Sequence, residues 1–492
     1  MQLKNKVQSL FVFGGVFIVL YMFFTRIHPL IIYDTDDWTY ISSTRDAFPL
    51  MESWNPGRIL PEILMPLCAS VATCVLYPIT GDYIMAMAYI FAFVLCLTIV
   101  IYIYMFKLML DKKMNCDKHI SIFVAIISLL LHFMIFRKFP HDNVYAFYAI
   151  DVTCYFYYII PSLLNIILIF TLELYPELFR LDTKHILRTG FMFLVIYLAI
   201  FSNLFSSYII AIWAGIKMII PFQLKKHTKE VAFLRHFIKK YLLNIVIICL
   251  WIVSMIYELN GGRAHSLNQT ADTFPLKKTI IFATDFLEKI NLLFALLFIV
   301  LLIVQWVILH TKYFDFKGLS DFAKEILIFE LLSIVYLIML CAKTKPEYIT
   351  RTEIIFGPVA VLIFAFCTML VILINSLPKI AVALPLLCCI IFFDINITEQ
   401  TFLESNTKGV DWKIAYQIDN YIIQQIKQAE DEGKIEVQLH VPFYASDDNW
   451  PQALPAASRF SQSLYKHGII SREMKVIMIP DKNINLRYCI PE

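Results

Sequence analysis

The amino-acid sequence predicts a polytopic α-helical membrane protein that ends in a small polar α/β domain. Of its 492 residues, 59% are hydrophobic and only 16% are charged, and the mean hydropathy is +0.68. Apolar runs long enough to cross a hydrocarbon layer of roughly 30 Å recur along most of the chain. The segment after the last run is hydrophilic. These observations exclude a soluble globular protein and separate a membrane domain, 1–395, from a polar domain, 396–492.

The apolar runs predict about eleven transmembrane helices. They lie at about 7–24, 82–109, 119–136, 152–173, 189–203, 204–221, 241–258, 291–310, 326–342, 354–375 and 378–395. With a cytoplasmic N-terminus, most loop lysines and arginines gather on the cytoplasmic side, in agreement with the positive-inside rule. We therefore expect a multi-pass plasma-membrane protein whose first outer loop, 25–81, and C-terminal domain both lie on the extracytoplasmic face.

One further apolar stretch, 58–77, allows two interpretations. It begins with Pro61 and Glu62 and ends before Pro78, so we expect it to lie along the membrane interface. If it crossed the membrane instead, every later helix would invert and the basic loops would face outward. The positive-inside rule argues against that inversion.

The C-terminal domain shows the alternation of a β-α-β-like unit. Apolar residues at helical spacing predict helices, and apolar residues that alternate with polar ones predict strands. The expected elements are a helix at 412–428, a strand at 436–441, a helix at 457–467 and a strand at 475–479.

Three aspartates, Asp34, Asp36 and Asp37, follow the first hydrophobic run, and Arg58 follows them at the start of the 58–77 stretch. Carboxylates beside a membrane are costly to keep unless they bind something or catalyse a reaction. Capping of a helix is the alternative for any one of them. The guanidinium of Arg58 suits a phosphate or carboxylate, and a salt bridge to Asp37 is the alternative.

Later outer loops supply further candidates for binding an anionic lipid head group. They are His141, Arg263, His265, Lys345 and Arg351. The chain contains no HExxH, P-loop, GxSxG or dinucleotide-binding pattern and no Cys/His metal spacing, which argues against hydrolase and nucleotide chemistry. The net charge of only +3, from 42 basic and 39 acidic residues, argues against a nucleic-acid partner.

This layout resembles the GT-C superfamily of membrane glycosyltransferases. The resemblance rests on the outer Asp-Asp loop after the first helix, the interfacial helix behind it, about eleven spans and the outer α/β tail. The nearest likeness is to bacterial polyprenyl-phosphate-sugar enzymes that modify surface polysaccharides. The tail motifs similar to the ends of such proteins are Val441-Pro442, Asp447-Asp448-Asn449-Trp450-Pro451 and Ser463-Leu464-Tyr465-Lys466-His467-Gly468-Ile469.

The resemblance implies a hexosyl- or pentosyltransferase that works on the outer face. It would move a sugar from a polyprenyl-phosphate donor to a cell-surface glycan or lipid-linked acceptor, with inversion, while membrane lipids surround it. Asp36 or Asp37 would be the base, Asp34 a supporting carboxylate, and Arg58 or a later outer-loop cation would stabilise the departing phosphate. Because some members need a divalent cation, Asp34 and Asp36 could hold Mg²⁺ or Mn²⁺.

Two other functions fit parts of the sequence. A polysaccharide polymerase or ligase would also use a lipid-linked sugar but would depend on outer-loop arginines such as Arg263 and Arg351. A lipid-linked sugar transporter or flippase would usually carry more ionisable groups inside its spans, whereas Glu330 is the one clear case here.

Overall fold

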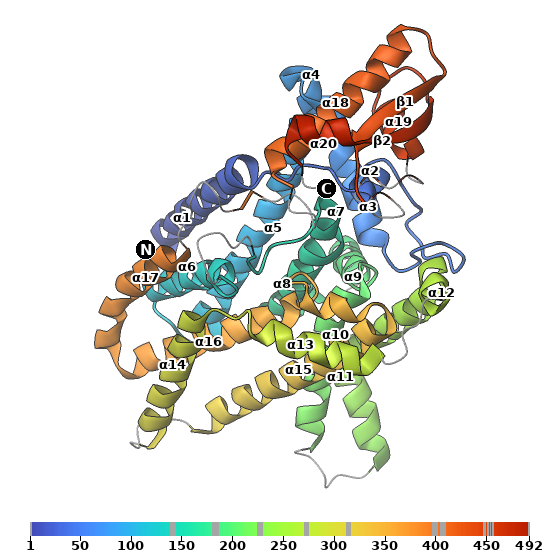
Figure 1. Ribbon diagram of the computed structural model, residues 1–492. Helices are drawn as coiled ribbons and strands as arrows, with labels where there is room; N and C mark the ends of the chain where they lie inside the picture. The colour runs from blue at the N-terminus through green and yellow to red at the C-terminus, as the bar shows by residue number, and fades with distance from the viewer. Residues whose placement is uncertain are drawn as a thin grey trace.

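The computed structural model is 76% helical, which confirms a polytopic helical protein with a small sheet near its C-terminus. The structure describes residues 2–137, 144–179, 186–223, 230–269, 275–310, 316–395, 402–403, 410–445, 449, 452, 454 and 457–490. In Figure 1 the helices form one body, and the C-terminal domain, in orange and red, lies at the top of the view.

The N-terminal half contains α1 (Gln2–Met22), η1 (Phe23–Ile27), α2 (Thr35–Tyr40), α3 (Ile59–Val71), η2 (Ala72–Leu76), α4 (Tyr77–Thr80), α5 (Tyr83–Lys113), α6 (Lys118–Met134), α7 (Val152–Cys154), η3 (Tyr155–Ile159), α8 (Ile160–Leu174), η4 (Pro176–Phe179), α9 (Ile186–Ile200) and α10 (Leu204–Gln223). The membrane domain continues with α11 (Glu230–Leu259), α12 (Gly262–Gln269), α13 (Pro275–Leu287), α14 (Leu292–His310), α15 (Phe316–Lys343), η6 (Pro346–Thr350), α16 (Phe356–Ser376), η7 (Pro378–Ala383) and α17 (Leu384–Ile395).

Eight helical segments in the described part of the chain are long and apolar enough to cross a membrane. They are Val7–Ile27, Ile59–Thr80, Tyr83–Lys113, Val152–Leu174, Phe237–Leu259, Ala323–Lys343, Phe356–Ser376 and Pro378–Ile395. A ninth candidate is the pair α13 and α14, which is bent by 84°. Seven of the eight match expected spans. The expected number of about eleven is not confirmed, because the other expected spans are shorter helices or part of the bent pair.

Three of these helical segments contain a wider π turn just before a proline. The turn η3 precedes Pro161, η2 precedes Pro78 and η1 precedes Pro29. Proline has no N–H, so the carbonyl four residues earlier loses its helical donor, and the backbone adjusts by widening the turn. In the first case the adjusted turn carries the aromatic residues Tyr155 to Tyr158.

The apolar segment formed by α3, η2 and α4 begins beside the short helix α2. At its start, Arg58 lines a cavity together with Asp36 of α2. The segment is long and apolar enough to cross a membrane. Its interfacial position therefore stays a prediction.

The C-terminal domain has the expected β-α-β order. Its elements are α18 (Trp412–Asp431), β1 (Glu436–Pro442), α19 (Ala457–Lys466), β2 (Lys475–Asp481) and α20 (Lys482–Tyr488). The two strands are parallel, with Glu436 opposite Lys475 and Pro442 opposite Asp481. The four predicted elements are confirmed to within a few residues, and α20 is an additional helix that was not predicted.

Trp38 of α2 packs against the C-terminal domain and hydrogen-bonds to it. Its side chain is 1% exposed, and its ring centroid lies 4.8 Å from that of Phe460. The indole Nε1 donates to Asp419 Oδ1 at 3.3 Å, and Ser463 Oγ donates to the Trp38 carbonyl at 2.7 Å. Because α2 also carries Asp36, the polar domain lies directly beside the aspartates of the first loop.

We predict that Trp38→Ala lowers the free energy of unfolding by roughly 3–5 kcal/mol, the usual cost of removing a buried aromatic side chain. Thermal unfolding of the purified protein in detergent measures this effect. Phe48→Ala is the control, because Phe48 is 72% exposed on the same loop. Equal melting temperatures for the two variants would contradict the docking role of Trp38.

Candidate functional site

The three aspartates of the first loop occupy different positions in the first turn of α2. Asp34 is the N-cap residue, and its Oδ1 accepts from the backbone N–H of Asp36 at 2.9 Å. Asp37 completes a capping box, because its Oδ2 accepts from the backbone N–H of Asp34 at 3.3 Å. Asp36, between them, makes no side-chain hydrogen bond to any residue that the structure describes, and its carboxylate is exposed.

The Asp37 side chain accepts hydrogen bonds from Tyr33, Asp34 and Thr153. Its Oδ1 accepts from the backbone N–H and the Oγ1 of Thr153, both at 2.7 Å, and its Oδ2 also accepts from the N–H of Tyr33 at 3.1 Å. The side chain is 1% exposed. These bonds join α2 to α7, so the structure gives Asp37 a positioning role and leaves Asp36 as the accessible carboxylate.

A cavity of about 510 Å³ opens in front of Asp36. Five of the residues that the sequence singled out line this cavity, although they come from four separate segments of the chain. They are Asp36, Arg58, Arg263, Lys345 and Arg351. The other lining residues are Tyr40, Ile150, Asp151, Thr153, Cys154, Tyr157, Tyr158, Glu347, Tyr348 and Thr350. Four cationic side chains therefore share this cavity with the accessible carboxylate of Asp36.

Two glycines bring Arg58 and Arg263 together. The backbone N–H of Gly262 donates to the Ser53 carbonyl, and that of Arg263 donates to the Trp54 carbonyl, both at 3.1 Å. A Cβ at Gly261 would overlap the ring of Pro56. Only glycine permits this close approach of the α11–α12 turn to the first loop.

Glu62 and its partners fix the loop that presents Arg58. Arg45 Nη1 donates to Glu62 Oε2 at 3.0 Å and to the Asn55 carbonyl at 2.6 Å. Tyr157 Oη donates to Glu62 Oε1 at 3.0 Å. The guanidinium of Arg58 lies 5.3 Å from the centroid of the Tyr157 ring, an attractive cation–π distance.

Arg351 is held from three directions. Its Nε donates to Oε1 of the buried Glu353 at 2.6 Å, and its Nη2 donates to Cys154 Sγ at 2.9 Å. Its guanidinium also lies 5.0 Å from the centroid of the Tyr348 ring. Arg263 Nη2 donates to the hydroxyl Oη of the same tyrosine, Tyr348, at 3.4 Å. The cations are thus oriented before any ligand is bound.

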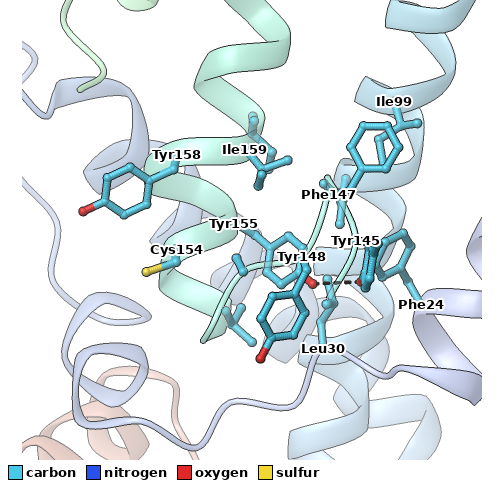
Figure 2. Close-up of a cluster of buried hydrophobic side chains, with 14 of the residues drawn as sticks. Phe24, Leu30, Ile99, Tyr145, Phe147, Tyr148, Cys154, Tyr155, Tyr158 and Ile159 are labelled. Atoms are coloured by element: carbon cyan, nitrogen blue, oxygen red, sulfur yellow. Dashed lines mark hydrogen bonds between the residues drawn. The ribbon is translucent and has the colours of Figure 1, made fainter. Parts of the chain in front are cut away.

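The start of the α7–α8 helix separates the aromatic core from the cavity. Figure 2 shows Tyr155 among buried aromatic residues, with its Oη 3.1 Å from that of Tyr145. Cys154 and Tyr158 point to the opposite side of the same helix (Figure 2), where they line the cavity.

A second cavity of about 70 Å³ adjoins the first and shares Arg58 and Arg263 with it. Arg58 is 6% exposed and Asn203 is 3% exposed, and both line this smaller cavity. Arg58 Nε and Asn203 Nδ2 are buried without a hydrogen-bond partner among the described residues. An unsatisfied buried donor costs roughly 1–3 kcal/mol, so these two donors, with Arg263 and Lys343 beside them, fit an anionic group.

Burial and nearby charges shift the pKa values of two carboxylates at the cavity. Burial among protein groups raises the pKa of Asp36, and the positive charges of Arg263, Arg58 and Arg351 oppose this rise. Burial, followed by repulsion from Asp37 and Asp36, also raises the pKa of Asp151.

Asp151 is a cavity residue that the sequence analysis did not select. It is the N-cap of α7, and its Oδ1 accepts from the backbone N–H of Cys154 at 2.5 Å. An acidic residue at the start of an aromatic-rich span was the signal available. That signal is weak, because caps of this kind are common at helix starts.

The remaining predicted residues lie elsewhere. His265 is exposed on α12 and does not line the cavity, and His141 lies outside the described residues. The described residues contain no group of three or more His, Cys, Asp or Glu side chains arranged for a metal ion. Asp34 already bonds the backbone of α2, so Asp34 and Asp36 do not fit a Mg²⁺ or Mn²⁺ site.

Comparisons with known proteins add no relative. No family model matches the chain, and neither the curated proteins nor the solved structures contain a similar one. The fold and the site by themselves define a membrane-embedded helical protein with a cavity lined by four cationic side chains and by the carboxylates of Asp36, Asp151 and Glu347.

We predict unequal stability effects for two neighbouring substitutions. Asp37→Asn should lower the free energy of unfolding by about 1–3 kcal/mol, because an amide nitrogen would face backbone donors that Asp37 now satisfies. Asp36→Asn should change it by less than about 0.5 kcal/mol, as expected for a side chain without internal bonds. Thermal unfolding measures both, and a larger loss for Asp36→Asn would contradict the assigned positions.

Proposed function

We propose that this protein is a membrane glycosyltransferase of the GT-C type. It moves a sugar from a polyprenyl-phosphate donor to a cell-surface glycan or lipid-linked acceptor on the extracytoplasmic face. The observation that carries the proposal is the cavity in which Asp36 faces Arg58, Arg263 and Arg351. An accessible carboxylate opposite fixed cations suits a reaction that removes a proton while an anionic group departs.

The donor phosphate binds at the boundary of the two cavities. There Arg58 Nε and Asn203 Nδ2 are buried donors without partners in the described chain, and Arg263 faces both spaces. Leu204, Leu259 and Leu340 supply apolar lining to the smaller cavity. A phosphate at this position satisfies the free donors, and the apolar side gives its lipid chain a route toward the membrane.

Asp36 takes the proton of the acceptor hydroxyl as the acceptor oxygen bonds to the anomeric carbon. The bond from that carbon to the phosphate oxygen breaks, and its electron pair leaves with the polyprenyl phosphate. The arginines stabilise the added negative charge on the phosphate. A single displacement of this kind inverts the anomeric configuration. Asp37 and Thr153 hold α2 in place for this step.

The alternatives differ in which side chains they need. A polysaccharide polymerase or ligase would depend on Arg263 and Arg351, which also line the cavity, and would tolerate loss of Asp36. A transporter or flippase would move the lipid-linked sugar without forming a glycosidic bond. The accessible position of Asp36 among these arginines favours the transferase.

The test is a glycosyl-transfer assay with membranes that carry radiolabelled polyprenyl-phosphate sugars. We predict that Asp36→Asn lowers kcat by about 10²–10⁴, the usual contribution of a general base. Asp46→Asn, an exposed aspartate of the same loop, is the matched control and should retain full activity. Full activity of Asp36→Asn with inactive Arg263→Gln would favour the polymerase or ligase. Translocation without transfer would favour the flippase.

We also predict a shift in pH dependence for Arg263→Gln. Arg263 is the charge that most strongly opposes the raised pKa of Asp36, so its removal should raise that pKa further. Because the base must be deprotonated, the acid limb of the kcat/KM profile should move to higher pH. The exposed Lys277→Gln on α13 is the control. An unmoved or downward-shifted limb would show that Asp36 does not set it.

A further inference from the structure

A third cavity lies at the end of the helical body opposite to the site. Its volume is about 280 Å³, and residues near the ends of α5 and α8 line it, whereas the starts of these helices lie at the site and the C-terminal domain. Phe106, Phe170 and Phe364 form part of its apolar wall. The expected topology places this end at the cytoplasmic leaflet.

Four charged side chains stand at this cavity, two of each sign. Lys217 Nζ lies 3.0 Å from Glu173 Oε1 and 2.9 Å from Glu325 Oε2. Lys113 Nζ is 3.6 Å from Glu173 Oε2, and its side chain is 48% exposed. Trp213 Nε1 donates to Glu173 Oε1 at 3.2 Å. Glu173 and Lys217 are therefore engaged with each other, while Lys113 and Glu325 have capacity left.

We propose that this cavity binds a membrane phospholipid whose head group carries both a phosphate and a primary ammonium, such as phosphatidylethanolamine. The phosphate pairs with Lys113, and the ammonium donates to Glu325, whose second oxygen is available. The acyl chains begin against the phenylalanine wall. The site is separate from the proposed catalytic cavity and shares no lining residue with it.

Charge complementarity selects this head group over others. A purely anionic head group would meet the carboxylates of Glu173 and Glu325, and a purely cationic one would meet both lysines. An unpaired or repelled charge weakens binding more in a partly buried site than at an open surface. The volume is close to the lower limit of ligand cavities, roughly 300 Å³, so it holds a head group and the first part of the chains.

Lipid titration of the detergent-purified full-length protein, followed by native mass spectrometry, tests the proposal. The probes are short-chain phosphatidylethanolamine and phosphatidylglycerol of equal chain length. We expect phosphatidylethanolamine to bind about tenfold more tightly, equal to ~1.4 kcal/mol. Equal binding, or tighter binding of phosphatidylglycerol, would overturn the proposal.

Two variants locate the binding. Glu325→Gln should abolish the preference for phosphatidylethanolamine, whereas Glu288→Gln, an exposed carboxylate outside this lining, should keep it. Val361→Phe fills the cavity without removing a charge, and it should weaken binding of phosphatidylethanolamine at least about tenfold. Val361→Phe also serves if Glu325→Gln does not fold. Unchanged binding to Val361→Phe would place the lipid elsewhere.

Discussion

The carboxylate of Asp37 is the interaction on which the site depends. It accepts four hydrogen bonds, two from Thr153 and one each from the backbone of Tyr33 and Asp34, and it is buried. These bonds fix the position of α2 relative to α7. Because Asp36 follows directly from this anchored turn, its carboxylate enters the cavity without a bond of its own. The carboxylate of Asp37 is buried and fully hydrogen-bonded, whereas that of Asp36 is accessible and makes no side-chain hydrogen bond to the described residues. Structural support and the proposed chemistry therefore fall on two consecutive residues.

The cations opposite Asp36 illustrate a second constraint. Guanidinium groups that are partly or fully buried need compensation, and here aromatic faces and carboxylates outside the cavity supply it. Tyr157 and Tyr348 stack against arginines, and Glu353 fixes Arg351 from behind. The carboxylate that orients Arg351 therefore lies outside the cavity, while the guanidinium lines it. Preorganised charge of this kind needs no rearrangement when an anion arrives.

Sequence patterns predicted the helical class, the order of elements in the C-terminal domain and five cavity residues, because hydropathy and residue chemistry are local properties. They could not separate Asp36 from Asp37, since that distinction depends on Thr153, which lies 116 residues further along the chain. Asp151 was missed for the same reason. Its role depends on neighbours from distant segments of the chain, and a lone helix cap carries no such information.

The docking of the C-terminal domain on α2 has a consequence for biosynthesis. The indole of Trp38 bonds to Asp419, which lies 381 residues further along the chain. Contacts of this kind form late, because the intervening segment must first be made and ordered. Every helix of the membrane domain is therefore synthesised before α2 has its covering domain. The helix α2 remains uncovered until the residues from Asp419 to Ser463 have been synthesised.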